Sequence, residues 1–164
     1  MRALQMTSLA LLVLLAGVGC GDKKGPAGNG GGFVLPSLDG DTVRLDELKG
    51  KVVLIDFWAT WCPPCRAYIP YLIALHDKYR ARGLVVLGLS NDDIGAMQQF
   101  REKEGIKYTL LVADNETMRR YKITAIPTSY LLDKKGKVVK REVGFDAGRV
   151  NQLEEEIKRL LSEK

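Results

Sequence analysis

The chain is organised around the sequence Trp61-Cys62-Pro63-Pro64-Cys65. An apolar run from Val52 to Ala59 precedes it and a helical pattern follows it, so the two thiols are predicted to lie at a strand-to-helix junction. A helix N-terminus presents unpaired N–H groups and partial positive charge, which favour a thiolate over a thiol. Cys62 is therefore predicted to be a nucleophile at neutral pH.

The spacing of the two cysteines limits the chemistry that they can share. With two residues between them, Cys65 can attack a mixed disulfide on Cys62 and release the substrate. The same spacing is half of a zinc site, but four ligands are needed and only Cys20 and His76 remain. A structural disulfide is another alternative, yet it does not explain the position before a helix. We interpret the pair as a redox-active disulfide that uses no metal and no other cofactor.

The first 32 residues are predicted to lie outside the folded domain. Residues 1–19 have the features of a signal peptide, namely a positive Arg2 and an apolar segment from Leu9 to Val18 that is too short to span a membrane. The segment resembles a bacterial lipoprotein signal, with Cys20 as the lipid attachment site, although Gly17 stands where leucine is usual. Simple cleavage and secretion is the alternative. Residues 20–32 are glycine-rich and predicted to form a flexible tether.

Charge gives little indication of a nucleic-acid partner. The chain carries 25 basic and 20 acidic side chains, a formal net charge of +5. Both signs are interspersed along residues 101–107 and 154–164, as on solvated helix faces. No aromatic and basic stripe or phosphate loop is present, so we predict no nucleic-acid binding.

Residues 33–164 are predicted to form one α/β domain in which strands and helices alternate. It begins with a hairpin at Asp39-Gly40 and ends with a helix that starts near Asp146. The elements between are strands at 51–59, 84–89, 108–112, 128–132 and 137–143, and helices at 62–82, around Met97 and Phe100, and at 115–121. On the outer side of the last helix, Glu154 and Lys158, and Glu155 and Arg159, are expected to form i,i+4 ion pairs.

Three features together resemble a known family. They are residues 56–65, then Pro70, and then Ala125-Ile126-Pro127-Thr128 before a strand. This pattern is similar to thioredoxin-fold proteins, and more narrowly to the TlpA/ResA group of membrane-tethered, extracytoplasmic thiol–disulfide oxidoreductases. The resemblance extends from Phe33 to the C-terminus. It implies a central mixed β-sheet flanked by helices, with an N-terminal β-hairpin and a TlpA-type insertion before Pro127.

The resemblance also implies roles for residues around the cysteines. Pro127 would follow a cis peptide bond and pack against Cys62, and the backbone of Ile126 would pair with an extended substrate chain. Trp61, Pro63 and Pro64 would shape the surface of the active site.

Asp56 occupies the position of the buried acid of thioredoxins, where it could take the Cys65 proton. Two departures from the family bear on this role. Thioredoxins pair the acid with a lysine on the neighbouring strand, but residues 84–90 contain none, and Tyr68 stands where this group often has glutamate.

The function expected from these residues is extracytoplasmic reduction of disulfides in exported proteins or apocytochromes, with electrons from a membrane protein of the DsbD/CcdA type. The protein would face the periplasm from a lipid anchor on Cys20, with the outer membrane favoured.

Two other functions remain open. Copper delivery of the Sco type fits soft thiolates, but those proteins have three residues between the cysteines and a histidine in a loop, whereas His76 lies about three helical turns beyond Cys65. A peroxiredoxin needs a Pro-X-X-X-Thr-X-X-Cys loop. Here Thr60 is two residues before Cys62 and the proline is missing.

Overall fold

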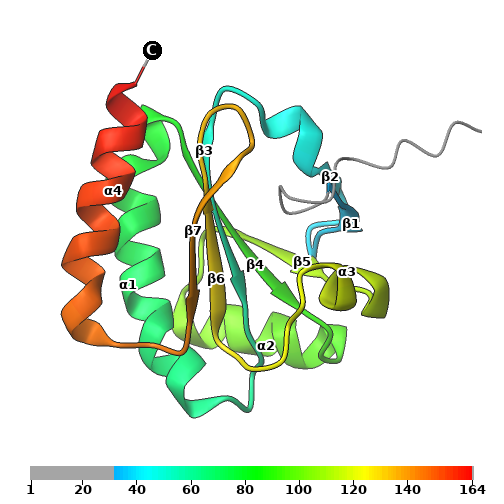
Figure 1. The fold of residues 1–164 in the computed structure, drawn as a ribbon. Coiled ribbons are helices and arrows are strands. Elements are labelled where there is room, and N and C mark those ends of the chain that lie inside the picture. The colour runs from blue at the N-terminus through cyan, green and yellow to red at the C-terminus, as the bar shows by residue number, and fades with distance from the viewer. Residues whose placement is uncertain (1–31, 164) are drawn as a thin grey trace, which may run out of the picture.

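A five-stranded mixed sheet forms the centre of the computed structural model, which describes residues 32–163 (Figure 1). The strand order is β5 (Thr109–Val112), β4 (Leu84–Ser90), β3 (Val52–Phe57), β6 (Thr128–Leu132) and β7 (Val138–Val143). The first three strands are mutually parallel, and β6 and β7 pair antiparallel. All six residues of β3 are buried, because this strand lies mid-sheet with packing on both faces.

Helices cover both faces of the sheet. One face packs against α1 (Pro63–Tyr79), α2 (Ile94–Glu104) and α4 (Val150–Ser162). The other packs against α3 (Asn115–Arg120), the 3₁₀ helix Leu45–Leu48 and the hairpin of β1 (Val34–Pro36) and β2 (Thr42–Arg44). In Figure 1, α1 and α4 lie side by side on one side of the sheet, and α3 and the hairpin lie on the other. The predicted α/β class with a central mixed sheet is confirmed.

Helix boundaries differ from prediction mainly in the geometry of the terminal turns. The helix predicted at 62–82 is α1 followed by a 3₁₀ turn, Arg80–Arg82, and it stops at Gly83, whose φ of +104° is accessible to glycine. Pro70 lies inside α1, as predicted. A second 3₁₀ turn, Ala147–Arg149, precedes α4. The predicted hairpin is confirmed, with Gly40 at φ +90° in its turn.

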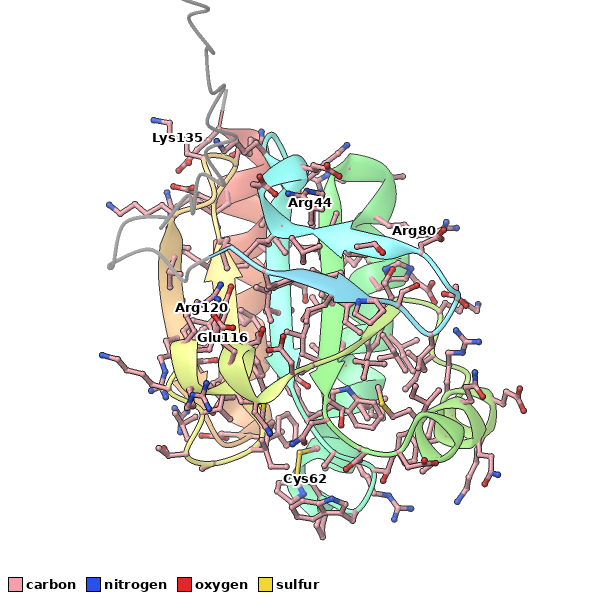
Figure 2. The ribbon with its side chains drawn as sticks, turned by 90° about the vertical axis from the view of Figure 1, so that its right-hand side faces the viewer. Arg44, Cys62, Arg80, Glu116, Arg120 and Lys135 are labelled. Carbon is pink, nitrogen blue, oxygen red and sulfur yellow. A yellow bond between two sulfur atoms is a disulfide. The ribbon has the colours of Figure 1, made fainter. Side chains whose placement is uncertain are left out.

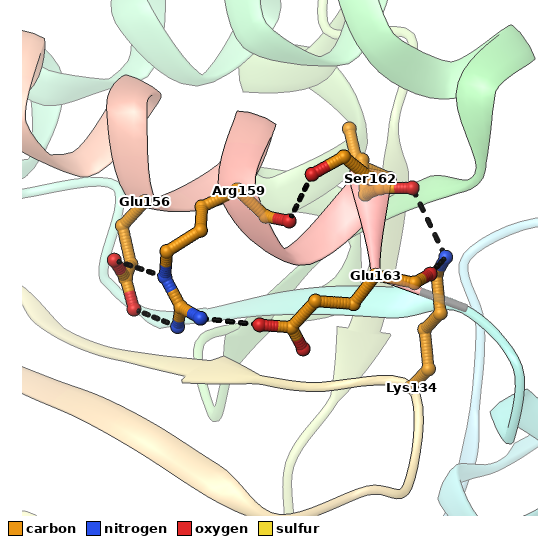
Figure 3. Close-up of polar contacts among 6 residues, drawn as sticks. Lys134, Glu156, Arg159, Ser162 and Glu163 are labelled. Atoms are coloured by element: carbon orange, nitrogen blue, oxygen red, sulfur yellow. Dashed lines mark hydrogen bonds and ion pairs between the residues drawn. The ribbon is translucent and has the colours of Figure 1, made fainter.

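The ion pairs predicted on α4 are partly wrong. Arg159 does not pair with Glu155; its guanidinium binds Glu156 and Glu163 instead (Figure 3). Lys158 binds Glu155 at 2.6 Å and lies 3.9 Å from Glu154. Glu154 is not on an outer face, because it accepts hydrogen bonds from Lys78 and Tyr79 of α1.

The C-terminus of α4 is held by the turn between β6 and β7. The Lys134 ammonium donates to the carbonyl oxygens of Leu161 and Glu163, where the helix leaves its last carbonyls unpaired (Figure 3). These contacts attach α4 to the sheet edge at the end far from the cysteines.

The predicted signal segment, Cys20 and nearly all of the predicted tether lie outside the described residues; only Gly32 of the tether is described. Within residues 32–163, every helix falls short of the length and apolar character needed to cross a membrane.

Candidate active site

A disulfide joins Cys62 and Cys65 at the start of α1. Cys62 is the N-cap residue, and the backbone N–H of Cys65 donates to Cys62 Sγ at 3.3 Å. Figure 2 shows the disulfide at one end of the molecule, with Lys135 of the β6–β7 turn at the opposite end. Cys65 is fully buried and Cys62 is 3% exposed, so only Cys62 borders the surface.

The cap geometry bears directly on reactivity. After reduction, a thiolate on Cys62 would keep the N–H of Cys65 as a donor and would lie at the positive end of a 17-residue helix. Both interactions favour the charged sulfur and lower the thiol pKa. The structure thus places the sequence-predicted nucleophile where thiolate chemistry is favoured.

The segment Ile126-Pro127 lies beside the disulfide. Its peptide bond is cis, as the family resemblance implied. The carbonyl oxygen of Ile126 is 3.8 Å from Cys62 Sγ, a van der Waals contact because a disulfide sulfur carries no hydrogen to donate. Pro127 is buried, whereas Ile126 is partly exposed and can be reached by a bound chain.

Trp61, Pro63 and Pro64 form the exposed rim of the site, and an aspartate outside the motif holds this rim in place. Trp61 is 71% exposed, yet its indole N–H donates to Asp92 at 3.2 Å. The other carboxylate oxygen of Asp92 accepts the backbone N–H of Thr60 at 2.6 Å. Its neighbour Asp93 caps α2. Asp92 instead anchors the loop before α1 to the β4–α2 loop.

Asp56 is completely buried on the α1 side of β3, and neither carboxylate oxygen has a hydrogen-bond partner among the described residues. Leu54 and Trp58, two residues to either side on the same face of the strand, pack in one cluster with Cys65. Burial raises the pKa of Asp56 to about 8. A carboxyl group with this pKa can exchange a proton with the Cys65 thiol at neutral pH.

The absence of a lysine partner for Asp56 has a steric cause. The residue opposite Asp56 on β4 is Gly88. A Cβ atom there would lie 2.6 Å from Leu110 Cδ2, 3.0 Å from Trp58 Nε1 and 3.2 Å from Tyr108 Cε2. These side chains occupy the space that a longer residue on β4 would need. The buried indole N–H of Trp58 likewise finds no acceptor within residues 32–163.

Tyr68 is buried beneath the active site and stacks on Phe145 with 5.0 Å between ring centroids. Its hydroxyl lies near the Ser129 side chain, whose polar contact favours the ionised phenol and acts to lower the Tyr68 pKa. Burial, and to a lesser degree the charge of Asp56, raise the pKa of Tyr68 above its usual range. Tyr68 stands where the family often has glutamate, whereas no pattern in the sequence indicates Ser129, which lies opposite Asp56 on β6.

His76 lies outside the site, as predicted. It packs edge-on against Tyr108 with 6.2 Å between ring centroids, and its buried Nδ1 has no partner among the described residues. Burial lowers the pKa of the imidazole. Nowhere in residues 32–163 do three or more histidine, cysteine, aspartate or glutamate side chains gather as metal ligands would.

Residues 30–141 match the AhpC/TSA family. The chain belongs to this family. Among curated relatives, the thiol–disulfide oxidoreductase ResA of Bacillus thuringiensis strain Al Hakam is 36% identical over 114 residues, which are 68% of this chain and 66% of that protein. ResA of Bacillus cereus strain ATCC 10987 is 34% identical over 130 residues, 78% of this chain and 74% of the relative. The chain is thus a homologue of the ResA oxidoreductases, although it spans just under two thirds of the first of them.

Solved structures of related proteins have the same fold as this chain. A Chlorobium tepidum protein provisionally named thiol:disulfide interchange protein DsbE has a TM-score of 0.77 and 34% identity, over 82% of this chain and 96% of that one. A thioredoxin family thiol:disulfide interchange protein from Chlorobium tepidum TLS has a TM-score of 0.72 and 30% identity, over 80% and 94%. Identity at this level, together with the cysteine pair at the helix start, confirms the predicted thioredoxin-like fold.

Proposed function

We propose that the protein is a thiol–disulfide oxidoreductase in which Cys62 is the attacking and Cys65 the resolving cysteine. The observation that carries this proposal is the disulfide at the N-cap of α1, with Cys62 alone at the surface and the Ile126 carbonyl beside it. Membership of the AhpC/TSA family and similarity to the ResA oxidoreductases support it.

The reduced protein begins the exchange with Cys62 as a thiolate. Its Sγ attacks one sulfur of a substrate disulfide, and the other substrate sulfur leaves and takes up a proton. Asp56, when ionised, accepts the proton of the Cys65 thiol, and Cys65 Sγ then attacks Cys62 Sγ of the mixed disulfide. The second substrate sulfur leaves as a thiol. Two electrons have passed to the substrate, and the Cys62–Cys65 disulfide has formed.

Substitution of each cysteine in turn tests this order. Cys65→Ser should accumulate a mixed disulfide with a disulfide-bonded peptide, detected by mass spectrometry, because Cys62 can attack but nothing releases it. Cys62→Ser should form none on Cys65, since that thiol is buried. An adduct that forms on Cys65 in Cys62→Ser, with none in Cys65→Ser, would reverse the assignment.

The direction of electron flow depends on the reduction potential. We propose a reductant of exported proteins or apocytochromes, recharged by a membrane donor of the DsbD/CcdA type and held at the membrane by a lipid on Cys20. Titration of the Cys62/Cys65 couple against dithiothreitol and glutathione should give roughly −250 mV or lower. A value near about −120 mV would indicate an oxidant. Metabolic labelling with a fatty acid, lost in Cys20→Ala, tests the anchor.

The two alternative functions, copper delivery and peroxide reduction, can be tested with the same protein. Stoichiometric Cu(I) binding that Cys62→Ser abolishes, with no disulfide reduction, would favour a copper carrier. Peroxide-dependent loss of both thiols at catalytic rates would favour a peroxidase. We expect neither, because the chain lacks the three-residue cysteine spacing of the first and the proline-containing loop of the second.

A further inference from the structure

The sheet aligns Asp56 with two polar residues that the mechanism above does not use. Strand pairing places Ser129 of β6 opposite Asp56 of β3, and Glu142 of β7 opposite Ser129. Directly opposed residues project from the same face of a sheet with their Cβ atoms about 4.5–5.5 Å apart. Because β7 is the last strand of the sheet, this polar row runs from the buried acid to an edge of the molecule.

Tyr68 of α1 covers the same row from above. Its hydroxyl lies near the Ser129 side chain, which lowers the Tyr68 pKa, and near enough to both Asp56 and Glu142 to interact electrostatically with each. Tyr68, Ser129 and Glu142 also line one surface pocket, together with residues of the segment before α4. The hydroxyls therefore lie between a carboxyl group that solvent does not reach and a pocket that solvent does.

Glu142 is suited to receive a proton at the outer end of the row. Its side chain is 18% exposed, so it contacts solvent, and it forms a 3.1 Å ion pair with Lys140 on the same strand. Asp146 and Arg149 stand at the rim of the pocket and pair with each other at 3.1 Å.

The remaining neighbours of Asp56 offer no comparable outlet. On the side of β4 and β5 it faces Gly88 and the buried ring of Tyr108, whose phenol pKa burial raises well above its usual value. Along β3 its neighbour on the same face is Trp58, whose indole N–H can donate but not accept. The titratable groups that connect Asp56 to solvent are thus those on β7 and the hydroxyls in between.

We propose that Ser129, Tyr68 and Glu142 form a proton relay between Asp56 and solvent. This inference rests on the proposed function, because it concerns the proton that Asp56 takes from Cys65. Before resolution, the carboxyl group of Asp56, which no described residue hydrogen-bonds directly, loses its proton through an intervening water to the hydroxyls of Ser129 and Tyr68. These pass a proton to the Glu142 carboxylate, and Glu142 releases it to solvent. Asp56 then accepts the Cys65 proton. Charge and atoms balance, and no electron moves along the relay.

The test compares two variants that break the same ion pair. Glu142→Gln removes the proton acceptor and the pairing with Lys140, whereas Lys140→Met removes the pairing but keeps the carboxylate. The full chain, reduced in advance, is mixed with excess oxidised glutathione, and formation of the Cys62–Cys65 disulfide is followed by tryptophan fluorescence. We expect resolution at pH 7 to be about tenfold slower in Glu142→Gln, a smaller loss than the roughly 10²–10⁴-fold that a general acid–base group contributes, because Asp56 itself is retained. Lys140→Met should stay within about twofold of wild type.

Three further readouts separate a relay from a structural effect. The Glu142→Gln defect should be relieved by millimolar imidazole, which can accept the proton in the pocket and carry it to solvent. The defect should also shrink above pH 8, where Asp56 is already ionised. Glu142→Asp should restore most of the rate. Equal rates in wild type and Glu142→Gln, or equal losses in Glu142→Gln and Lys140→Met, would overturn the relay. A wild-type chain that exchanges no disulfide would overturn the proposed function itself.

Discussion

Asp56 is the residue whose environment departs furthest from its preference in water. An ionised carboxylate without hydrogen bonds is strongly disfavoured inside a protein, so the group takes up a proton instead. Ser129 and Glu142 lie in the same row but are nearer to the sheet edge. A group that is protonated near neutrality and lies under a cysteine pair can serve as acid and as base.

Asp56 should therefore make stability depend on pH. Its pKa is about 8 when folded and 3.8 when unfolded, so the unfolded chain loses this proton first. The free energy of unfolding should fall from about pH 4 to about pH 8 and then level off. At pH 7 the loss is roughly 4 kcal/mol. Asp56→Asn should remove this slope and be more stable at pH 7, measured by urea unfolding. Asp77→Asn, at an exposed position, should keep it.

Any side chain at Gly88 should destabilise the folded protein, because neighbouring side chains fill the space around this residue. Gly88→Ala would force Leu110 and Trp58, both buried, to move and should lower the free energy of unfolding by about 1–3 kcal/mol. Gly32→Ala, with nothing within 4 Å of the added carbon, should be neutral. Chemical denaturation of both variants measures this, and equal stabilities would mean that the pocket around Gly88 can expand.

At the level of elements, the start of α1 is fixed from two directions. The hydrogen bond from the Cys65 N–H to Cys62 Sγ lies within the first turn of the helix. Asp92, in the β4–α2 loop, accepts a hydrogen bond from the Thr60 N–H in the loop before the helix. The loop that presents Cys62 is thus tied to a neighbouring element. A nucleophile held this way keeps its orientation toward Ile126.

Two adjacent aspartates allow this tie to be tested with a matched control. Asp92→Ala should raise hydrogen exchange at the Thr60 amide about tenfold or more, because a charge-assisted hydrogen bond is lost. Asp93→Ala removes the cap of α2 instead and should cost about 1 kcal/mol of stability, leaving Thr60 exchange unchanged. Faster Thr60 exchange in both variants would point to general loosening of the β4–α2 loop.

Across the whole molecule, β3 joins two cores. Alternate residues of the strand point into the cluster under α1 and α4 and into the cluster under α3 and the N-terminal hairpin. Loss of packing on one face should therefore weaken both. Helix α4 packs into the first of these clusters through Ile157, and Lys134 hydrogen-bonds to its C-terminal end.

Ile157→Ala should lower the free energy of unfolding by about 2–5 kcal/mol, as expected for a fully buried side chain. Tryptophan fluorescence, which reports on the α1 side, and hydrogen exchange in the hairpin should show the same loss. The exposed Glu155→Ala is the control. Two separate transitions in Ile157→Ala would show that the faces unfold independently.

Local patterns in the sequence determined much of the fold and the reacting atoms. The apolar run before Cys62 predicted a buried central strand, and the motif predicted a helix that begins at the cysteines. These features depend on residues close together in the chain, where propensity, periodicity and capping act. The ion pair predicted between Glu155 and Arg159 was wrong, because spacing alone cannot choose among several acidic neighbours.

Tertiary structure alone decided what surrounds Asp56. Gly88, Ser129 and Glu142 are 32, 73 and 86 positions away in the chain, and they meet Asp56 only through the register of four strands. A shift of one residue in any pairing would turn these side chains to the opposite face. The cysteine pair is therefore a property of the sequence, whereas the pKa of the acid beneath it, and the polar row that leads from it to solvent, result from strand register and burial.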